Sequence, residues 1–372
     1  MKNHYFKLSC LAIFALFTFA CQNAASDKKT TSTDPTALKE KFKGKTLNIL
    51  CWEGYADESF TKAFADMYGC SVKGSYFGSS DELISKLQAG GGAAYDVVSP
   101  SSDVARYLVE ADLVQPIDPS KISSWNDLSP TLKDMKDVQK DGKTYGMPFT
   151  WGPDYLVYNA DVVKEEPKSW KELWNPKYKG KVSLWDDISN LYLMGQILGY
   201  DKTDKGAIYN MSDEQLAAAQ AELVKLKPQI RKYWATAGEL DNMMKNKEVV
   251  MAVGWPITPA TLNKQGMNIK SVIPQEGATG WIDRLMVTKG ATNAELAELY
   301  LDFISKPENM AGVAKTTTYS IANPKAAASM DKELQDLTFV NNMGYYHEHL
   351  NFWQPVKNRK RYNEIWNEVK SK

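Results

Sequence analysis

The chain has 372 residues with 45 basic and 45 acidic side chains, so its formal net charge is zero. A nucleic-acid-binding protein would be expected to carry a basic excess, and this balance therefore argues against nucleic acid as a partner. Beyond residue 20, no apolar stretch reaches the length of about 20 residues that a membrane-spanning helix needs.

The segment 1–20 has the layout of a secretory signal peptide. Two lysines precede an apolar run at 8–20, which is too short to cross a bilayer, and Cys21 follows it directly. Residues 21–44 are rich in Ser, Thr and Lys and nearly free of large apolar side chains. We expect an exported protein in which a lipidated Cys21 and the flexible tether 21–44 anchor the body to a membrane. An ordinary cleaved signal peptide is the alternative, because Thr18 stands where a lipidation motif most often has leucine.

Strands and helices alternate along the rest of the chain, which is about 330 residues long. The pattern predicts the first three strands, in chain order, at 47–51, 71–77 and 95–100. Helical patterns between them predict a parallel sheet with helices on both faces. If the first two strands are parallel neighbours, Cys51 and Cys70 lie at opposite ends of the pair, beyond the reach of a disulfide.

Two segments predict crossings between two lobes. Residues 144–159 are apolar, aromatic and punctuated by Gly and Pro, which suits a strand that passes from one lobe to the other, and 279–290 resembles the return. A chain of this length also exceeds what one core usually organises. We therefore predict an α/β protein of two lobes, each a central, mainly parallel sheet flanked by helices, with a hinge of two crossing segments. The predicted lobes are 45–150 plus 282–327 for lobe 1 and 151–281 plus 328–372 for lobe 2.

Tryptophan and carboxylate side chains recur at the predicted carboxyl ends of the strands, where open parallel sheets bind their ligands. In chain order these ends carry Trp52, Glu53, Tyr55, Ser101, Asp103, Trp185, Asp186, Asp187, Trp255, Trp281 and Asp283. Taken singly, such a Trp more often belongs to the core, and such a carboxylate can merely cap a helix. Their recurrence at one edge instead predicts a site for a small organic cation. A Trp face attracts a cation by roughly 0.5–2 kcal/mol, and a carboxylate accepts charge-assisted hydrogen bonds from it.

Other kinds of site are not expected. The triple glycine at 90–92 follows a helix and precedes a strand, which is the reverse of the order in a dinucleotide-binding loop. His347 and His349 are spaced i,i+2, so they lie on different sides of a helix and do not suit a metal pair. Strand alternation turns the basic Arg284 away from Asp283. Because no pair of nucleophile and base is visible either, we expect no cofactor, no metal and no enzymatic activity.

The chain resembles the spermidine/putrescine-binding proteins of ABC importers from residue 47 to its C-terminus. The resemblance rests on Trp52 with Tyr55, YDVVSPS at 95–101, SWKELWNPKYKGKVSLWDD at 169–187, GWIDRL at 280–285, and Trp353 with Gln354. It implies the two-lobed type II periplasmic binding protein fold and a location in the periplasm or at the cell surface. It also implies that a monomer delivers a polyamine, putrescine or spermidine, to a permease and ATPase complex in the inner membrane.

The resemblance further implies which residues contact the ligand. By position they are Trp52, Tyr55, Ser101, Asp187, Trp255, Trp281, Asp283, Tyr319 and Gln354. The chain departs from the family where Gly54 replaces a usual acid, with Glu53 beside it. It departs again where Asn190 replaces a glutamate and Asp103 replaces an aromatic or small residue. Glu53, Asp103 and Asn190 therefore join the candidate site, and Asn190 favours a shorter diamine, a monocation or an amine with one neutral end.

Two other functions stay open at this point. Ferric iron carriers share the implied fold and use paired tyrosines, and Tyr345 with Tyr346 is such a pair, although it lies away from the position expected of an iron site. A sensor, whose closed form would contact a receptor instead of a permease, has no feature in the sequence that separates it from an importer component.

Overall fold

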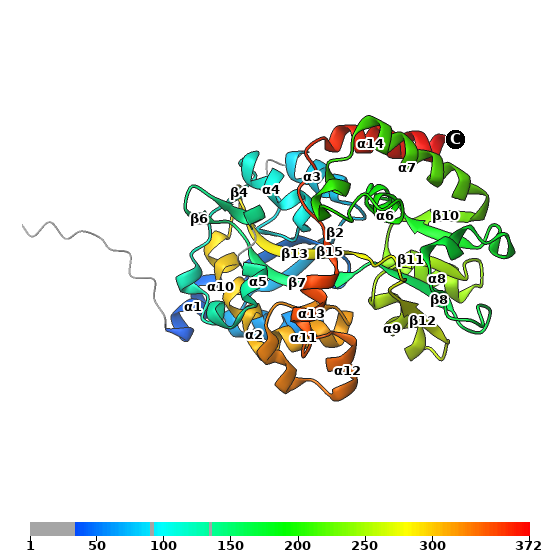
Figure 1. Ribbon diagram of the computed structural model, residues 1–372. Coiled ribbons are helices and arrows are strands. Elements are labelled where there is room, and N and C mark those ends of the chain that lie inside the picture. The colour runs from blue at the N-terminus through cyan, green and yellow to red at the C-terminus, as the bar shows by residue number, and fades with distance from the viewer. Residues whose placement is uncertain (1–33, 90–92, 134–135) are drawn as a thin grey trace, which may run out of the picture.

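The computed structural model describes residues 34–89, 93–133 and 136–372. Two sheets organise this part of the chain (Figure 1). The first has the strand order β14-β7-β13-β3-β1-β2, with β4 and β15 also paired to β13, and the second has the order β10-β9-β11-β8-β12. The predicted signal peptide and Cys21 lie outside the described residues. No helix within the described ranges is long and apolar enough to span a membrane.

The first sheet is built from both ends of the chain. Its strands are β1 (Thr46–Cys51), β2 (Ser71–Tyr76), β3 (Val97–Val98), β4 (Val114–Gln115), β7 (Met147–Pro153), β13 (Thr279–Thr288), β14 (Ser320–Ile321) and β15 (Asn351–Phe352). A separate ribbon is formed by β5 (Gln139–Lys140) and β6 (Lys143–Thr144). The helices in this part of Figure 1 are α1 (Pro35–Phe42), α2 (Glu58–Tyr68), α3 (Ser80–Ala89), α4 (Ser102–Glu110), α5 (Pro130–Lys133), α10 (Ala294–Ser305), α11 (Pro307–Thr317), α12 (Lys332–Leu337) and α13 (Met343–His349).

The second sheet uses the middle of the chain. Its strands are β8 (Tyr155–Asn159), β9 (Val182–Trp185), β10 (Ile230–Trp234), β11 (Met251–Gly254) and β12 (Ile269–Val272). Around it lie α6 (Ser189–Ile197), α7 (Asp213–Leu226), α8 (Ala237–Lys245), α9 (Ile257–Lys264) and the C-terminal α14 (Arg359–Ser371) (Figure 1).

The predicted parallel pairing of the first two strands is confirmed. Thr46 lies opposite Ser71, and Cys51 lies opposite Tyr76 at the other end of the pair. Cys51 and Cys70 are both free in the described chain, as their positions at opposite ends require. Both sheets are nevertheless mixed rather than mainly parallel. β7 and β8 run antiparallel to their neighbours, and β13 runs antiparallel to β3, β4 and β7 but parallel to β15.

Local sequence signals explain where the helices begin and end. The side chain of Asp57 accepts a hydrogen bond from Ser59 N and caps α2, which buries Phe60 and Phe64 against the first sheet. Gly69 ends this helix with a φ of 64°, a left-handed conformation that glycine adopts without a steric penalty.

Three connections join the two sheets. Asp154 alone separates β7 in the first sheet from β8 in the second, and residues 273–278 lead from β12 back to β13. β7 and β13 pair with each other, with Asp283 opposite Thr150, so the two crossings lie side by side. The third connection follows β15 and ends at α14, which packs on α7. The predicted lobe boundaries stay predictions; β15 itself pairs with β13 in the first sheet.

Candidate ligand-binding site

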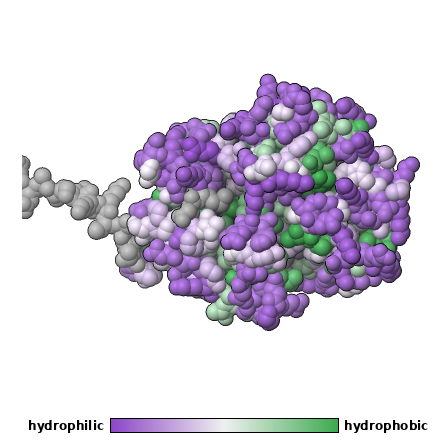
Figure 2. Space-filling view, in the orientation of Figure 1, coloured by the Kyte–Doolittle hydropathy of each residue, from purple (hydrophilic) through white to green (hydrophobic). Residues whose placement is uncertain are grey.

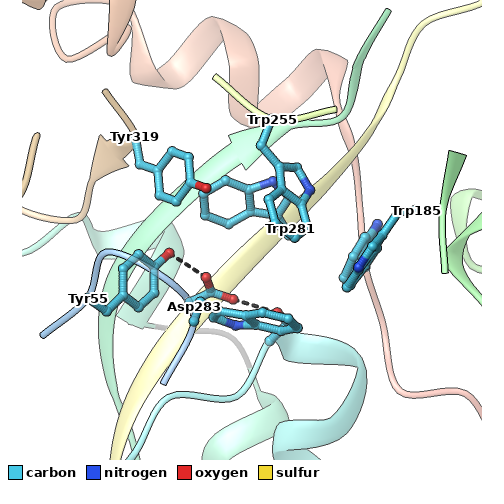
Figure 3. A pocket seen from close by; sticks show the side chains of 9 residues that line it. Tyr55, Trp185, Trp255, Trp281, Asp283 and Tyr319 are labelled. Carbon is cyan, nitrogen blue, oxygen red and sulfur yellow. Dashed lines mark hydrogen bonds between the residues drawn. The ribbon is translucent and has the colours of Figure 1, made fainter. Parts of the chain in front are cut away.

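A small cavity lies where strand ends from both sheets meet. The space inside it is about 20 Å³, enough for about one water molecule, so a ligand with several heavy atoms needs the walls to move apart. It is lined by Trp52, Tyr55, Ser101, Trp185, Trp255, Trp281, Asp283, Tyr319 and Trp353 (Figure 3). The chemistry of the lining therefore suits a small molecule that prefers aromatic surfaces and one carboxylate.

Asp283 is the carboxylate on the cavity wall. It is 3 % exposed and accepts hydrogen bonds from the hydroxyl groups of Ser101 and Tyr55 (Figure 3). The Tyr55 hydroxyl also contacts Thr150. Burial raises the pKa of Asp283 to about 7, while the hydrogen bonds from Ser101 and Tyr55 oppose this rise. A cation in the cavity would favour the ionised form of Asp283 and would be bound by it.

Aromatic rings from both sheets form the rest of the wall. Trp185, at the end of β9, stacks on Trp353 with 6.0 Å between ring centroids and an interplanar angle of 9°. Trp255, just after β11, meets Trp185 edge to face at 4.9 Å. On the other side, Trp281 of β13 meets Tyr319 at 4.7 Å. These rings offer the negative faces that attract organic cations.

Seven of the predicted site residues line the cavity together. They are Trp52, Tyr55, Ser101, Trp255, Trp281, Asp283 and Tyr319. Trp185 and Trp353 line it as well, although the sequence had marked Trp185 only as a strand-end residue and Trp353 only as part of the family resemblance. Trp353 also follows a strand, β15, directly. This strand has only two residues and is too short to predict from sequence, so the strand-end rule could not identify Trp353.

Asp103 lies outside the cavity and pairs with a cation of the protein itself. Its carboxylate is 2.8 Å from Nη1 of Arg359 and also accepts hydrogen bonds from Tyr192 and Ser80. Arg359 further contacts Asp81 through Nε at 2.9 Å. Asp103 belongs to α4 beside the first sheet and Arg359 opens α14 beside the second, so this ion pair joins the two lobes.

Asp187 and Asn190 also lie behind the cavity wall. Asp187 is buried, and burial raises its pKa to about 7 while the charge of Arg359 opposes the rise. Within the described residues its Oδ2 has no hydrogen-bond partner, whereas Oδ1 accepts from Ser189 N at 2.9 Å. The amide of Asn190 donates to the carbonyl oxygens of Trp185 and Asp187, so it holds the loop after β9.

Glu53 and Gln354 line neighbouring hollows instead. Glu53 accepts a hydrogen bond from Gly238 N at 3.3 Å, in the first turn of α8. Gln354 shares a hollow with Arg106 and Lys136. Among the twelve predicted ligand residues, the structure therefore leaves Glu53, Asp103, Asp187, Asn190 and Gln354 off the cavity wall.

Direct contacts hold the two lobes together across the cavity. The indole nitrogen of Trp185 donates to the carbonyl oxygen of Gly78 at 2.9 Å, and Thr318 Oγ1 donates to the carbonyl oxygen of Pro256 at 3.1 Å. Figure 2 shows a largely hydrophilic face with apolar side chains gathered toward its middle. The arrangement is that of a closed, two-lobed molecule with an aromatic interior between the lobes.

Comparison with known proteins agrees with this geometry. The model of the family "Bacterial extracellular solute-binding protein" matches residues 58–339. The spermidine/putrescine-binding periplasmic protein of Escherichia coli (strain K12) is 29 % identical over 295 residues, covering 78 % of this chain and 81 % of that protein. The putrescine-binding periplasmic protein PotF of the same strain is 26 % identical, covering 78 % and 82 %.

Solved structures show the same architecture. A putative spermidine/putrescine ABC transporter from Listeria monocytogenes superposes with a TM-score of 0.78 at 26 % identity, covering 88 % of this chain and 99 % of that chain. The predicted two-lobed type II periplasmic binding protein fold is confirmed by this likeness.

Proposed function

Because the chain belongs to the bacterial extracellular solute-binding protein family, we propose that it is the substrate-binding component of an ABC importer that captures a small organic cation. A polyamine, putrescine or spermidine, is the ligand we propose, since relatives with 26–29 % identity are named for these amines. The observation that carries the proposal is the position of Asp283, a buried carboxylate at the wall of an aromatic cavity.

The chemistry of the cavity matches an alkyl ammonium ion. The carboxylate of Asp283 accepts charge-assisted hydrogen bonds from an ammonium group. The indoles of Trp255 and Trp281 cover methylene groups and attract the positive charge, by roughly 0.5–2 kcal/mol for each favourable ring. The described cavity wall carries no basic side chain that would suit an anion.

Capture follows from the two-lobed architecture. Trp52, Tyr55 and Asp283 belong to the first sheet or its loops. Trp185 ends β9 and Trp255 follows β11, both in the second sheet. A ligand that contacts both groups binds the closed form better than an open one, so it shifts the population toward closure. The crossings at Asp154 and at residues 273–278 supply the hinge, and the closed form then docks on a permease and its ATPase. No covalent step is involved.

Membrane attachment is proposed from the sequence alone. A lipid on Cys21 would hold the monomer at the membrane in the periplasm or at the cell surface. The predicted flexible tether 21–44 is wrong for its last part, because Pro35–Phe42 form helix α1 and bury Leu38 and Phe42. Only the part of the tether that precedes α1 is proposed to separate the body from the membrane. The relatives are periplasmic proteins by name, which supports an extracytoplasmic location.

A thermal-shift screen tests the proposal. The delipidated protein is unfolded and refolded to remove carried-over ligand, then heated with putrescine, spermidine, spermine, choline, betaines, basic amino acids and ferric citrate. A ligand at a hundred times its Kd adds about 2.7 kcal/mol to the free energy of unfolding. We expect putrescine or spermidine to raise the melting temperature.

A shift with ferric citrate alone would favour the iron carrier, and a shift with choline, a betaine or an amino acid alone would favour another amine or zwitterion. Either outcome would contradict the polyamine proposal. Co-purification with a receptor in place of a permease would favour a sensor.

A further inference from the structure

A second buried carboxylate lies at the first crossing between the lobes. Asp154, between β7 and β8, is 5 % exposed. Its backbone N–H donates to the carbonyl oxygen of Thr279 at 2.9 Å, and Thr279 Oγ1 donates to Asp154 Oδ2 at 2.6 Å. The carboxylate of Asp154 is thus fixed to the first residue of β13.

That attachment places Asp154 on the face of β13 that forms the cavity. Side chains alternate along a strand, so Thr279, Trp281 and Asp283 share one face. Both Trp281 and Asp283 line the cavity, while Arg284 points the other way and pairs with Asp137. The carboxylate of Asp154, which accepts from Thr279, therefore lies at the Thr279 end of the β13 face that carries Trp281 and Asp283.

Two tryptophans that line the cavity, Trp255 and Trp353, also influence Asp154. Burial raises the pKa of Asp154 to about 7, and the hydroxyl of Thr279 and the indole N–H groups of Trp353 and Trp255 oppose the rise. Among the described residues, Trp353 Nε1 has no hydrogen-bond partner of normal geometry, so its effect on Asp154 is electrostatic. The carboxylate of Asp154 is therefore close enough to these two indoles to be affected by their N–H groups.

The length of β13 between Thr279 and Asp283 is of the order that a short diamine needs between two carboxylates. Four residues at about 3.3 Å each put the Cα atoms of Thr279 and Asp283 about 13 Å apart. A four-carbon diamine has five bonds of about 1.5 Å between its nitrogens and extends over about 6 Å. One charge-assisted hydrogen bond of about 2.8 Å at each end brings the span between carboxylate oxygens to about 12 Å. Trp281 stands between the two ends, where the methylene groups would lie.

Other acidic side chains near the cavity lie close to a basic residue. Arg359 contacts Asp103 at 2.8 Å and Asp81 at 2.9 Å, and its charge also acts on Asp187. An ammonium group placed beside these acids would be repelled by the guanidinium of Arg359. Asp154 has no basic side chain among the groups that influence its ionisation.

We infer that Asp154 is the second carboxylate of the ligand site and receives the far ammonium of a diamine whose near ammonium is bound by Asp283. The inference rests on the proposed cation-binding function and names its substrate class, an unbranched diamine of about four carbons. Asp154 does not line the cavity in this closed form, whereas Trp255 and Trp353 do. The proposal therefore requires one of these indoles to rotate on binding, a side-chain change that is common at interfaces.

Calorimetric titrations with putrescine and 1-butylamine test the inference, because the two amines share a carbon chain but differ in the second ammonium. We expect the native protein to bind putrescine at least about tenfold more tightly, in the range of one charged hydrogen bond. In Asp154→Asn the amide oxygen still accepts from Thr279, and we expect the ratio of the two dissociation constants to fall toward one. Equal weakening of both amines would mean a structural role and would overturn the inference.

The same substitution at Asp187 tests the rival position. If Asp187→Asn removes the preference for putrescine and Asp154→Asn does not, Asp187 is the second carboxylate and the inference is wrong. If the native protein binds neither amine, the proposed amine-binding function is wrong. This result differs from the one that would overturn only the role of Asp154, so the two outcomes can be told apart.

A second measurement needs no variant and covers the case in which Asp154→Asn does not fold. Titrations at pH 7 in buffers of different ionisation enthalpy count the protons released on binding. Putrescine should release protons from both Asp154 and Asp283, whereas 1-butylamine should release them from Asp283 alone. Equal proton release by the two amines would contradict the inference.

Discussion

The ion pair between the lobes gives a stability prediction that can be worked out from the structure. In Arg359→Met the side chain keeps most of its apolar length but loses its charge. Asp103, whose side chain is 0 % exposed, is then left buried without its cationic partner. Removal of one member of a buried pair typically costs about 3–5 kcal/mol. Asp81 contributes less, because its side chain is 38 % exposed and solvent screens it.

Urea unfolding followed by tryptophan fluorescence at pH 7.5 measures this cost. The matched control is Arg361→Met on the same helix, where the partner Asp213 is 74 % exposed and the expected loss is below about 1 kcal/mol. In the double variant Arg359→Met with Asp103→Asn, no unpaired buried charge remains at position 103, so we expect it to be more stable than Arg359→Met alone. The reasoning is refuted if Arg359→Met costs no more than Arg361→Met, or if the double variant is the least stable.

Three further predictions concern titration and the aromatic wall. Because the pKa of Asp283 is about 7, putrescine affinity should rise with pH up to about pH 8. Below pH 7 the affinity should fall by up to about tenfold per pH unit. Calorimetry between pH 5.5 and 8.5 measures this dependence, and a flat profile would contradict the prediction. Tyr55→Phe removes a hydrogen bond from Asp283 and raises its pKa further, so putrescine affinity should drop at pH 7 and recover at pH 9, whereas equal loss at both would exclude an effect through titration. Trp255→Ala should weaken putrescine binding by about 2–30-fold, the equivalent of about 0.5–2 kcal/mol, and an unchanged Kd would show that this ring does not meet the cation.

A half-buried histidine, His347, gives a pH effect on stability. Burial lowers the pKa of His347 to about 4, whereas the unfolded chain binds this proton near pH 6.5. The unfolded state therefore holds more protons between these values, and His347 lowers stability as pH falls from about 6.5 toward 4. In urea unfolding, His347→Gln should lose less stability than the native protein over this window. Parallel pH profiles for the two proteins would contradict the effect.

Much of the site could be predicted from strand ends and strand alternation. In the segment 279–285 the period of two assigns Trp281 and Asp283 to one face and Arg284 to the other, and the ion pair of Arg284 with Asp137 confirms that it points away from Asp283. These are local relations, so a single sequence carries them.

The remaining contacts depend on tertiary structure. Arg359 and Asp103 form an ion pair although they are 256 positions apart in the chain. No local sequence pattern predicts a pair of residues at such a separation. Asp154 follows Gly152 and Pro153, so in sequence it resembles a turn residue rather than part of a site. The family resemblance assigns Asn190 to the ligand site. Its amide instead donates to the nearby backbone carbonyl oxygens of Trp185 and Asp187, as short polar side chains often do.

The central claim is that Asp283 binds a cationic amine inside the aromatic cavity, and calorimetric titration of putrescine into Asp283→Asn tests it most directly. The matched control is Asp186→Asn, which removes the same charge from a partly exposed side chain bound to Lys370 outside the cavity. We predict that Asp283→Asn weakens putrescine binding by at least about tenfold while Asp186→Asn binds as the native protein does. Unchanged binding in Asp283→Asn, or equal loss in both variants, would contradict the claim.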